Sequence, residues 1–167
     1  MVAADKALHF GAEREVMAAL TIAMESYPGI AEARWVIEHG DPRAESPLET
    51  LGRYAFLSAG MPAPLSNVWI LAGGEWFRVD HLIPETGVIL EADGAIKYDN
   101  RDDASRLIAN DRHRERLLRA LTYGLGRYVW ADADFHPAAV IARAREAAHL
   151  RPAAPVPTGW TLRSPFA

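Results

Sequence analysis

Three carboxylates and a lysine stand close together in the middle of the chain. Asp80 ends one apolar stretch, Glu91 and Asp93 end the next, and Lys97 follows them. Successive side chains of a strand point to opposite faces of its sheet, so Glu91 and Asp93 share one face of a strand over 88–93. Carboxylates this close raise each other's pKa unless a cation lies between them. With Asp80 on an adjacent strand, they predict an oxygen-rich site for Mg²⁺ or Mn²⁺.

Lys97 adds a positive charge to this group. The chain has 18 Lys and Arg residues, and only Lys6 and Lys97 are lysines. A lysine is a compact point charge that can approach a water molecule or a phosphate. The alternative is a surface hairpin whose acidic tip pairs with Lys97 and gains little stability.

Arginines downstream offer local contacts for a polyanion. Arg114 lies among leucines at helical spacing, so it needs either an internal carboxylate, such as Asp111 or Glu49, or a substrate phosphate. Arg112 fits phosphate recognition or a solvated helix face with intrahelical pairs. Together with Arg78, these two arginines are the candidate nucleic-acid contacts. Because the net charge is −4, any such contact must be local.

The elements that must position these residues follow from periodicity, glycines and prolines. Ser46, Pro47 and Glu49 predict a helix start with a capping box, so Glu49 either caps this helix or turns toward the metal. Gly73-Gly74 predicts a hairpin. We expect a helical extension over 1–44, an α/β domain over 45–150 and a Pro-rich, extended or disordered tail over 151–167. The expected helices are 2–26, 29–39, one from Ser46, 103–122 and 135–150, and the expected strands are 67–71, 75–82, 88–93 and 125–130.

Four motifs in this order resemble the PD-(D/E)XK nuclease superfamily. They are Glu45-Ser-Pro-Leu-Glu49, the run from Arg78-Val-Asp80 to Glu91-Ala-Asp93-Gly94, Asp111-Arg-His-Arg114-Glu115, and the strand from Tyr123-Gly124 to Trp130. The likeness covers roughly residues 41–133 and is closest to the very-short-patch-repair-like branch, as in the C-terminal domains of type IV (abortive-infection) antitoxin-like proteins. The superfamily's usual lysine is replaced by Asp93, and Lys97 stands where relatives often carry a histidine.

The resemblance implies a fold and an activity. The fold would be a restriction-endonuclease-like αβββαβ core, with a mixed four-stranded sheet flanked by helices. The activity would be Mg²⁺- or Mn²⁺-dependent DNA endonuclease, with Asp80, Glu91, Lys97 and Glu49 as catalytic residues and Asp80, Glu91 and Asp93 as metal ligands. The alternative is a catalytically inactive nuclease-like module that binds DNA or protein, such as an antitoxin or regulator. His81, which borders the site, is a further candidate base or phosphate contact.

Composition sets outer limits. At 167 residues, 50% hydrophobic and 24% charged, the chain is long and apolar enough for one core. No apolar run is long enough to span a bilayer, so we expect no membrane association. The absence of cysteine excludes disulfides and thiolate metal sites and fits a cytoplasmic protein. DNA is the expected partner, and a homodimer or a partner protein both remain open.

Overall fold

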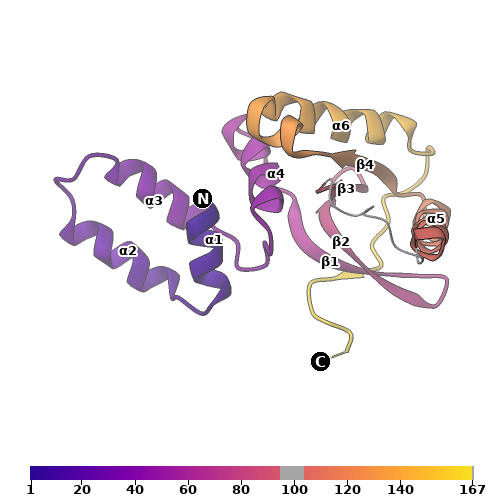
Figure 1. Ribbon diagram of the computed structural model, residues 1–167, viewed down its shortest axis with the longest axis horizontal. Coiled ribbons are helices and arrows are strands. Elements are labelled where there is room, and N and C mark those ends of the chain that lie inside the picture. The colour runs from indigo at the N-terminus through magenta and orange to yellow at the C-terminus, as the bar shows by residue number, and fades with distance from the viewer. Residues whose placement is uncertain (95–103, 167) are drawn as a thin grey trace.

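A five-stranded mixed sheet lies at the centre of the protein, whose computed structural model describes residues 1–94 and 104–166 (Figure 1). The strand order is β4-β3-β2-β1-β5, with β3 and β4 parallel and the other pairs antiparallel. The fold is therefore α/β, as predicted, but the sheet has five strands rather than four. The strands are β1 (Leu65–Ala72), β2 (Glu75–Ile83), β3 (Val88–Ala92), β4 (Gly124–Tyr128) and β5 (Trp160–Thr161).

The connections between strands explain their directions. Gly73 and Gly74 join β1 to β2 with φ of 60° and 85°, and two successive positive φ angles suit glycine in a tight hairpin turn. The parallel pair β3–β4 needs a crossover, which contains α5 (Ala104–Ala120).

The extra strand comes from the tail, which was expected to be extended or disordered. Trp160 pairs with Ile70 on the outer edge of β1, and Phe166 packs edge-to-face on Trp69 with ring centroids 5.4 Å apart. Arg151 donates hydrogen bonds to the carbonyls of Ala154 and Pro155 at 2.8 and 2.6 Å. The contacts of Trp160, Phe166 and Arg151 therefore order a segment whose proline content had predicted an extended or disordered tail.

Helices cover both faces of the sheet (Figure 1). Neighbouring residues of β3 point to opposite faces, and Leu90 packs in a core with α4 (Pro47–Ser58) and α6 (Pro137–Leu150), whereas Ile89 packs in a second core with Leu118 of α5. The order α4, three strands, α5, β4 agrees with the predicted element order. Beyond β4, Trp130 is 45% exposed and precedes the π-helix η1 (Ala131–Phe135), although the sequence had suggested a core strand residue.

The helical extension is built from three helices instead of the expected two. The stretch predicted as one helix over 2–26 divides into α1 (Val2–His9) and α2 (Arg14–Ala23), with Gly11 at φ 91° between them, and α3 (Ile30–His39) follows. Buried Asp5 of α1 accepts hydrogen bonds from the Asp41 amide and the Thr50 hydroxyl, both at 2.8 Å, and pairs with Arg53 of α4. These contacts hold α1 against α4. In the described residues, no helix combines the length and apolarity needed to cross a membrane.

Candidate functional site

Asp80 and Glu91 face each other at the end of the β2–β3 pairing. The register places His81 opposite Leu90, and its continuation puts Asp80 opposite Glu91. Asp80 Oδ2 accepts a hydrogen bond from the Ala92 amide at 2.8 Å. Burial, followed by the charge of Asp80, raises the pKa of Glu91 from 4.5 to about 7. Near neutral pH Glu91 is therefore protonated for part of the time.

Arg114 on α5 reaches across to this pair. It donates to Glu91 Oε1 at 2.6 Å and to the Arg78 carbonyl at 2.9 Å, with 24% of its side chain exposed. The arginine partly offsets the rise in the pKa of Glu91. The sequence suggested Asp111 or Glu49 as its internal partner, whereas the structure pairs it with Glu91.

A shallow pocket opens beside the pair, between α5 and β4. Arg127 of β4 lies opposite Glu91 in the parallel register. It donates a hydrogen bond to Asp111 at 2.7 Å, and this bond is the largest cause of the raised pKa of Arg127. Sequence reasoning did not select Arg127 as a site residue. The available signal was its place on a strand expected to run beside Glu91. The lining residues are Glu91, Asp111, Arg114, Glu115, Leu118, Arg119, Leu125, Gly126 and Arg127.

Glu49 serves as a cap in this structure. The Ser46 hydroxyl accepts a hydrogen bond from the Glu49 amide at 3.2 Å, as expected of a capping box. The same hydroxyl donates a hydrogen bond to Glu49 Oε1 at 2.7 Å. Glu49 Oε2 accepts from the Glu45 amide at 3.0 Å and from Asn67 at 2.7 Å. Both oxygens of this buried carboxylate are thus engaged at the helix start.

The other predicted site residues lie in different settings. Asp93 is half-buried, and its amide donates to the Tyr128 carbonyl at 2.8 Å. Arg78 pairs with Glu45 at the surface, Arg112 is exposed on α5, and Lys97 lies outside the described residues. Over 1–94 and 104–166, no group of three or more His, Asp and Glu side chains gathers as metal ligands would.

A buried His81–Tyr128 pair lies on the other face of the sheet from these carboxylates, against α4. His81 Nε2 is 2.8 Å from the Tyr128 hydroxyl, which donates to the Leu48 carbonyl at 3.1 Å. Burial, then the charge of Arg53, lowers the pKa of His81 to about 3. Burial also raises the pKa of Tyr128, followed by the negative charges of Asp80, Glu49 and Glu91. Because His81 is only 1% exposed, it orients Tyr128 and does not face solvent as a base would.

The arrangement can therefore hold a proton or a cation between two carboxyl groups, with arginines beside them. Asp80 and Glu91 each use one oxygen for a contact outside the pair, with the Ala92 amide and with Arg114. No family model, no curated protein and no solved structure matches this chain, so its function has to be inferred from the side chains of this site.

Proposed function

We propose that this protein is a metal-dependent endonuclease that hydrolyses phosphodiester bonds of DNA. The observation that supports this best is the facing pair Asp80 and Glu91, in which burial, followed by the charge of Asp80, raises the pKa of Glu91 to about 7. Two acids held this close form a site where a divalent cation would replace the proton of Glu91. The motif resemblance to the PD-(D/E)XK nucleases is consistent with this function.

The donor set fits Mg²⁺ or Mn²⁺. These hard cations accept carboxylate oxygens, and Mg²⁺ commonly binds one or two carboxylates while keeping several waters and a substrate phosphate. Asp80 and Glu91 would hold the ion, and Asp93 could act through a water molecule. When bound, the ion would lower the pKa of a water molecule and stabilise charge on the scissile phosphate.

The chain's own groups would bind and orient the substrate. Arg114 and Arg127 line the pocket beside Glu91, and arginine forks match phosphate oxygens. Arg78 and Arg112 would extend this contact along the DNA backbone. Glu91 must lose its proton before it can act as a ligand, so activity should increase as pH rises through about 7. Lys97 is proposed to orient the attacking water or the phosphate.

Plasmid nicking tests this proposal. Wild-type protein should nick DNA with Mg²⁺ or Mn²⁺ and not with EDTA, and D80N and E91Q should abolish nicking. E75Q is the matched control, because Glu75 is an exposed carboxylate that pairs with His113 rather than with the Asp80–Glu91 pair. Nicking by D80N at the wild-type rate would contradict the proposal.

A catalytically inactive nuclease-like binding module is the second candidate, and the Arg114 contact favours it. Arg114 already occupies one oxygen of Glu91 at 2.6 Å, and Glu49 is engaged in its helix cap. Such a module would bind DNA or a partner protein equally well with and without Mg²⁺ and would never cut. Metal-independent binding combined with no nicking would therefore favour this second function.

A further inference from the structure

The hairpin formed by α2 and α3 extends away from the sheet and is held together by arginines. Arg14 of α2 donates to the Glu38 and Gly40 carbonyls at 2.9 and 2.7 Å and also contacts the Ile37 carbonyl. In return, Arg34 of α3 bonds the hydroxyl and the carbonyl of Thr21, each at 3.1 Å. Each arginine thus satisfies carbonyls near the C-terminal end of the opposite helix.

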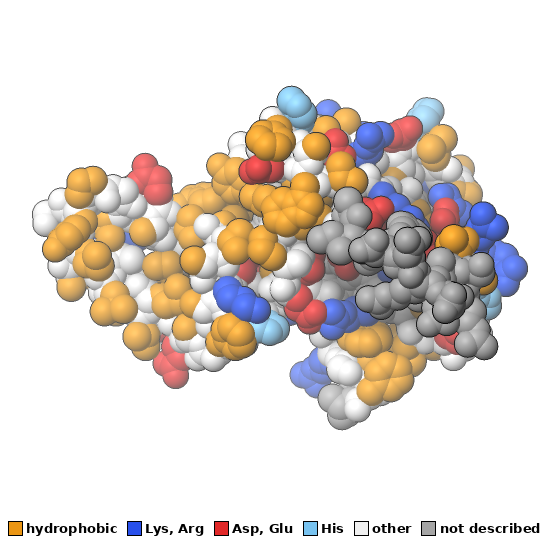
Figure 2. All heavy atoms as spheres, in the orientation of Figure 1, with side chains coloured by type: hydrophobic (Ala, Val, Ile, Leu, Met, Phe, Trp, Pro, Cys, Tyr) orange, Lys and Arg blue, Asp and Glu red, His pale blue; other side chains and the backbone are white. Residues whose placement is uncertain are grey.

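With arginines between the helices, the large apolar side chains lie outside. α3 contains no buried residue, and Thr21 is the one buried residue of α2. Val16, Leu20 and Met24 recur every four residues and form a stripe, and Figure 2 shows hydrophobic side chains gathered over this end of the molecule. We name as the hairpin apolar surface the three residues of this stripe, Val16, Leu20 and Met24, which are 43% to 60% exposed.

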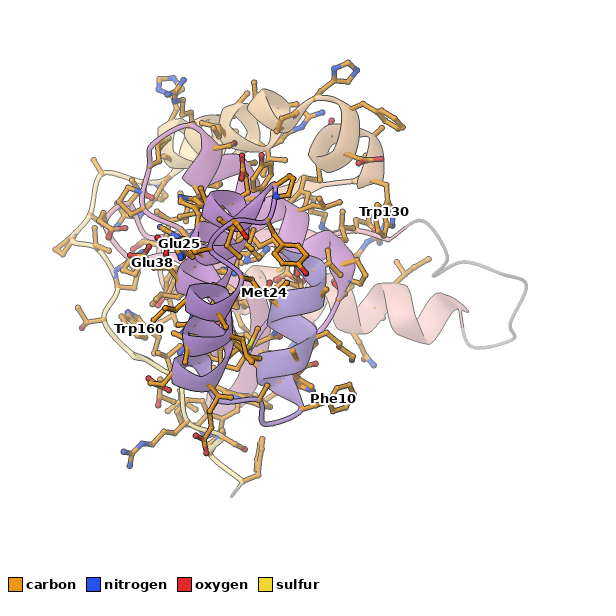
Figure 3. All side chains as sticks on the ribbon, turned by 90° about the vertical axis from the view of Figure 1, so that its left-hand side faces the viewer. Phe10, Met24, Glu25, Glu38, Trp130 and Trp160 are labelled. Atoms are coloured by element: carbon orange, nitrogen blue, oxygen red, sulfur yellow. The ribbon has the colours of Figure 1, made fainter. Side chains whose placement is uncertain are left out.

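The charged side chains of the hairpin that do not bond to its backbone have one sign, whereas Lys6 of α1 lies over the neighbouring Phe10 ring, with Nζ 4.6 Å from the ring centroid. Between residues 13 and 38 the chain has five glutamates and two arginines, and the arginines are the ones bonded to carbonyls and to Thr21. All five glutamates are exposed, and no ion pair engages them among the described residues; Glu25 and Glu38 can be followed in Figure 3. A second copy would bring acid against acid, and DNA or an anionic membrane would also be repelled.

We propose that the hairpin apolar surface is a docking site for an amphipathic helix of a partner protein, with an apolar face and lysines or arginines along its flanks. Two short helices with an exposed apolar stripe are an incomplete bundle, and a third helix would cover the stripe. The carbonyl contacts of Arg14 and Arg34 hold the two helices together before the partner binds, which lowers the ordering cost of binding. This proposal does not depend on the nuclease function.

Fluorescence anisotropy with two labelled synthetic helical peptides tests the docking site. Both peptides carry the same leucine stripe, one flanked by lysines and the other by glutamates. The lysine-flanked peptide should bind the wild-type chain, and the glutamate-flanked one should bind at least about tenfold more weakly. V16S/L20S and, separately, E25K/E38K should each weaken binding of the lysine-flanked peptide at least about tenfold. L150S removes an equally exposed leucine at the end of α6 and should leave binding unchanged.

Three results would overturn the proposal. The lysine-flanked peptide could fail to bind, or it could bind V16S/L20S as tightly as wild type. Alternatively, sedimentation of the free chain could show a dimer that V16S/L20S dissociates, which would identify a second copy as the occupant. Circular dichroism melts verify that each variant is folded, and DNA nicking is measured separately because docking and nicking are expected to be independent.

Discussion

At the residue scale, Arg114 has both a structural contact and a proposed substrate contact, because it pairs with Glu91 and lines the pocket. Since both side chains are about one-fifth exposed (24% and 19%), we expect R114A to cost about 1–3 kcal/mol of unfolding free energy, less than for a fully buried pair. R112A, which removes an exposed arginine of the same helix, should change stability by less than about 0.5 kcal/mol. Urea unfolding of both variants measures this. An R114A variant as stable as wild type, with weaker DNA binding, would show that Arg114 acts mainly on phosphate.

The raised pKa of Glu91 predicts a pH dependence of stability. The folded protein holds this proton up to about pH 7, whereas the unfolded chain releases it near 4.5. Glu91 therefore stabilises the fold fully below about pH 4.5, and this contribution is lost as pH rises through about 7, at up to about 1.4 kcal/mol per pH unit. E91Q should flatten this part of the profile. Melting temperatures of wild type and E91Q between pH 5 and 8 test this, and parallel profiles would argue against it.

The positions of Asp80 and Glu91 could be predicted from local patterns, whereas their contacts could not. Strand alternation and two successive hairpins are enough to bring Asp80 and Glu91 to facing strands. The contact of Arg114 with Glu91 depends on how α5 lies across β3, which no local pattern specifies. Arg127 likewise enters the site only through the parallel β3–β4 register. For Glu49, the sequence allowed either a helix cap or a metal contact. In the structure the Glu45 amide and the Asn67 side chain donate hydrogen bonds to its carboxylate, which holds it at the helix start as a cap.

At the element scale, α4 must pass close to Tyr128. A Cβ at Gly52 would lie 2.1 Å from the Tyr128 hydroxyl oxygen and 2.6 Å from its Cζ. Gly→Ala within a helix normally gains about 0.5–1 kcal/mol, but overpacking a core costs about 1–3 kcal/mol. We expect the clash to dominate, so G52A should destabilise the protein.

The double variant G52A/Y128F tests the cause of this loss. Removing the hydroxyl relieves the shorter clash and leaves the Cζ contact. The loss of unfolding free energy caused by G52A should therefore be smaller in the Y128F background than in wild type. Chemical unfolding of the four proteins gives the coupling energy. Additive losses would show that Tyr128 is not the obstacle.

Elements with strong local signals were the predictable ones. The Ser46 cap, the Gly73-Gly74 turn and the strands on either side agree with the structure. The break between α1 and α2 was missed because the apolar and alanine-rich pattern continues on both sides of Gly11. β5 was not predicted because a strand of two residues is too short to show an alternating pattern. Its pairing with β1 also joins residues that are far apart in the sequence.

At the scale of the whole molecule, a net charge of −4 makes DNA binding depend on a few arginines. If Arg78, Arg112, Arg114 and Arg127 each displace one counterion, the logarithm of the DNA association constant should fall with the logarithm of salt concentration with a slope of about −4. Each single Arg→Ala variant should reduce the slope by about one. Binding isotherms over a salt series measure this, with R143A, an arginine of α6, as the control. An unchanged slope in all four variants would move the DNA contact elsewhere on the protein.

The parallel β3–β4 pair has a consequence for the folding pathway. β1, β2 and β3 are joined by short turns, so they can pair through contacts that are local in the sequence. β4 can pair with β3 only after the long connection between them has brought the two strands together. Arg114, on that connection, and Arg127, on β4, therefore reach Glu91 late. While β4 is still unpaired, Asp80 and Glu91 would face each other without their arginine neighbours, so the acidic pair forms before the pocket beside it.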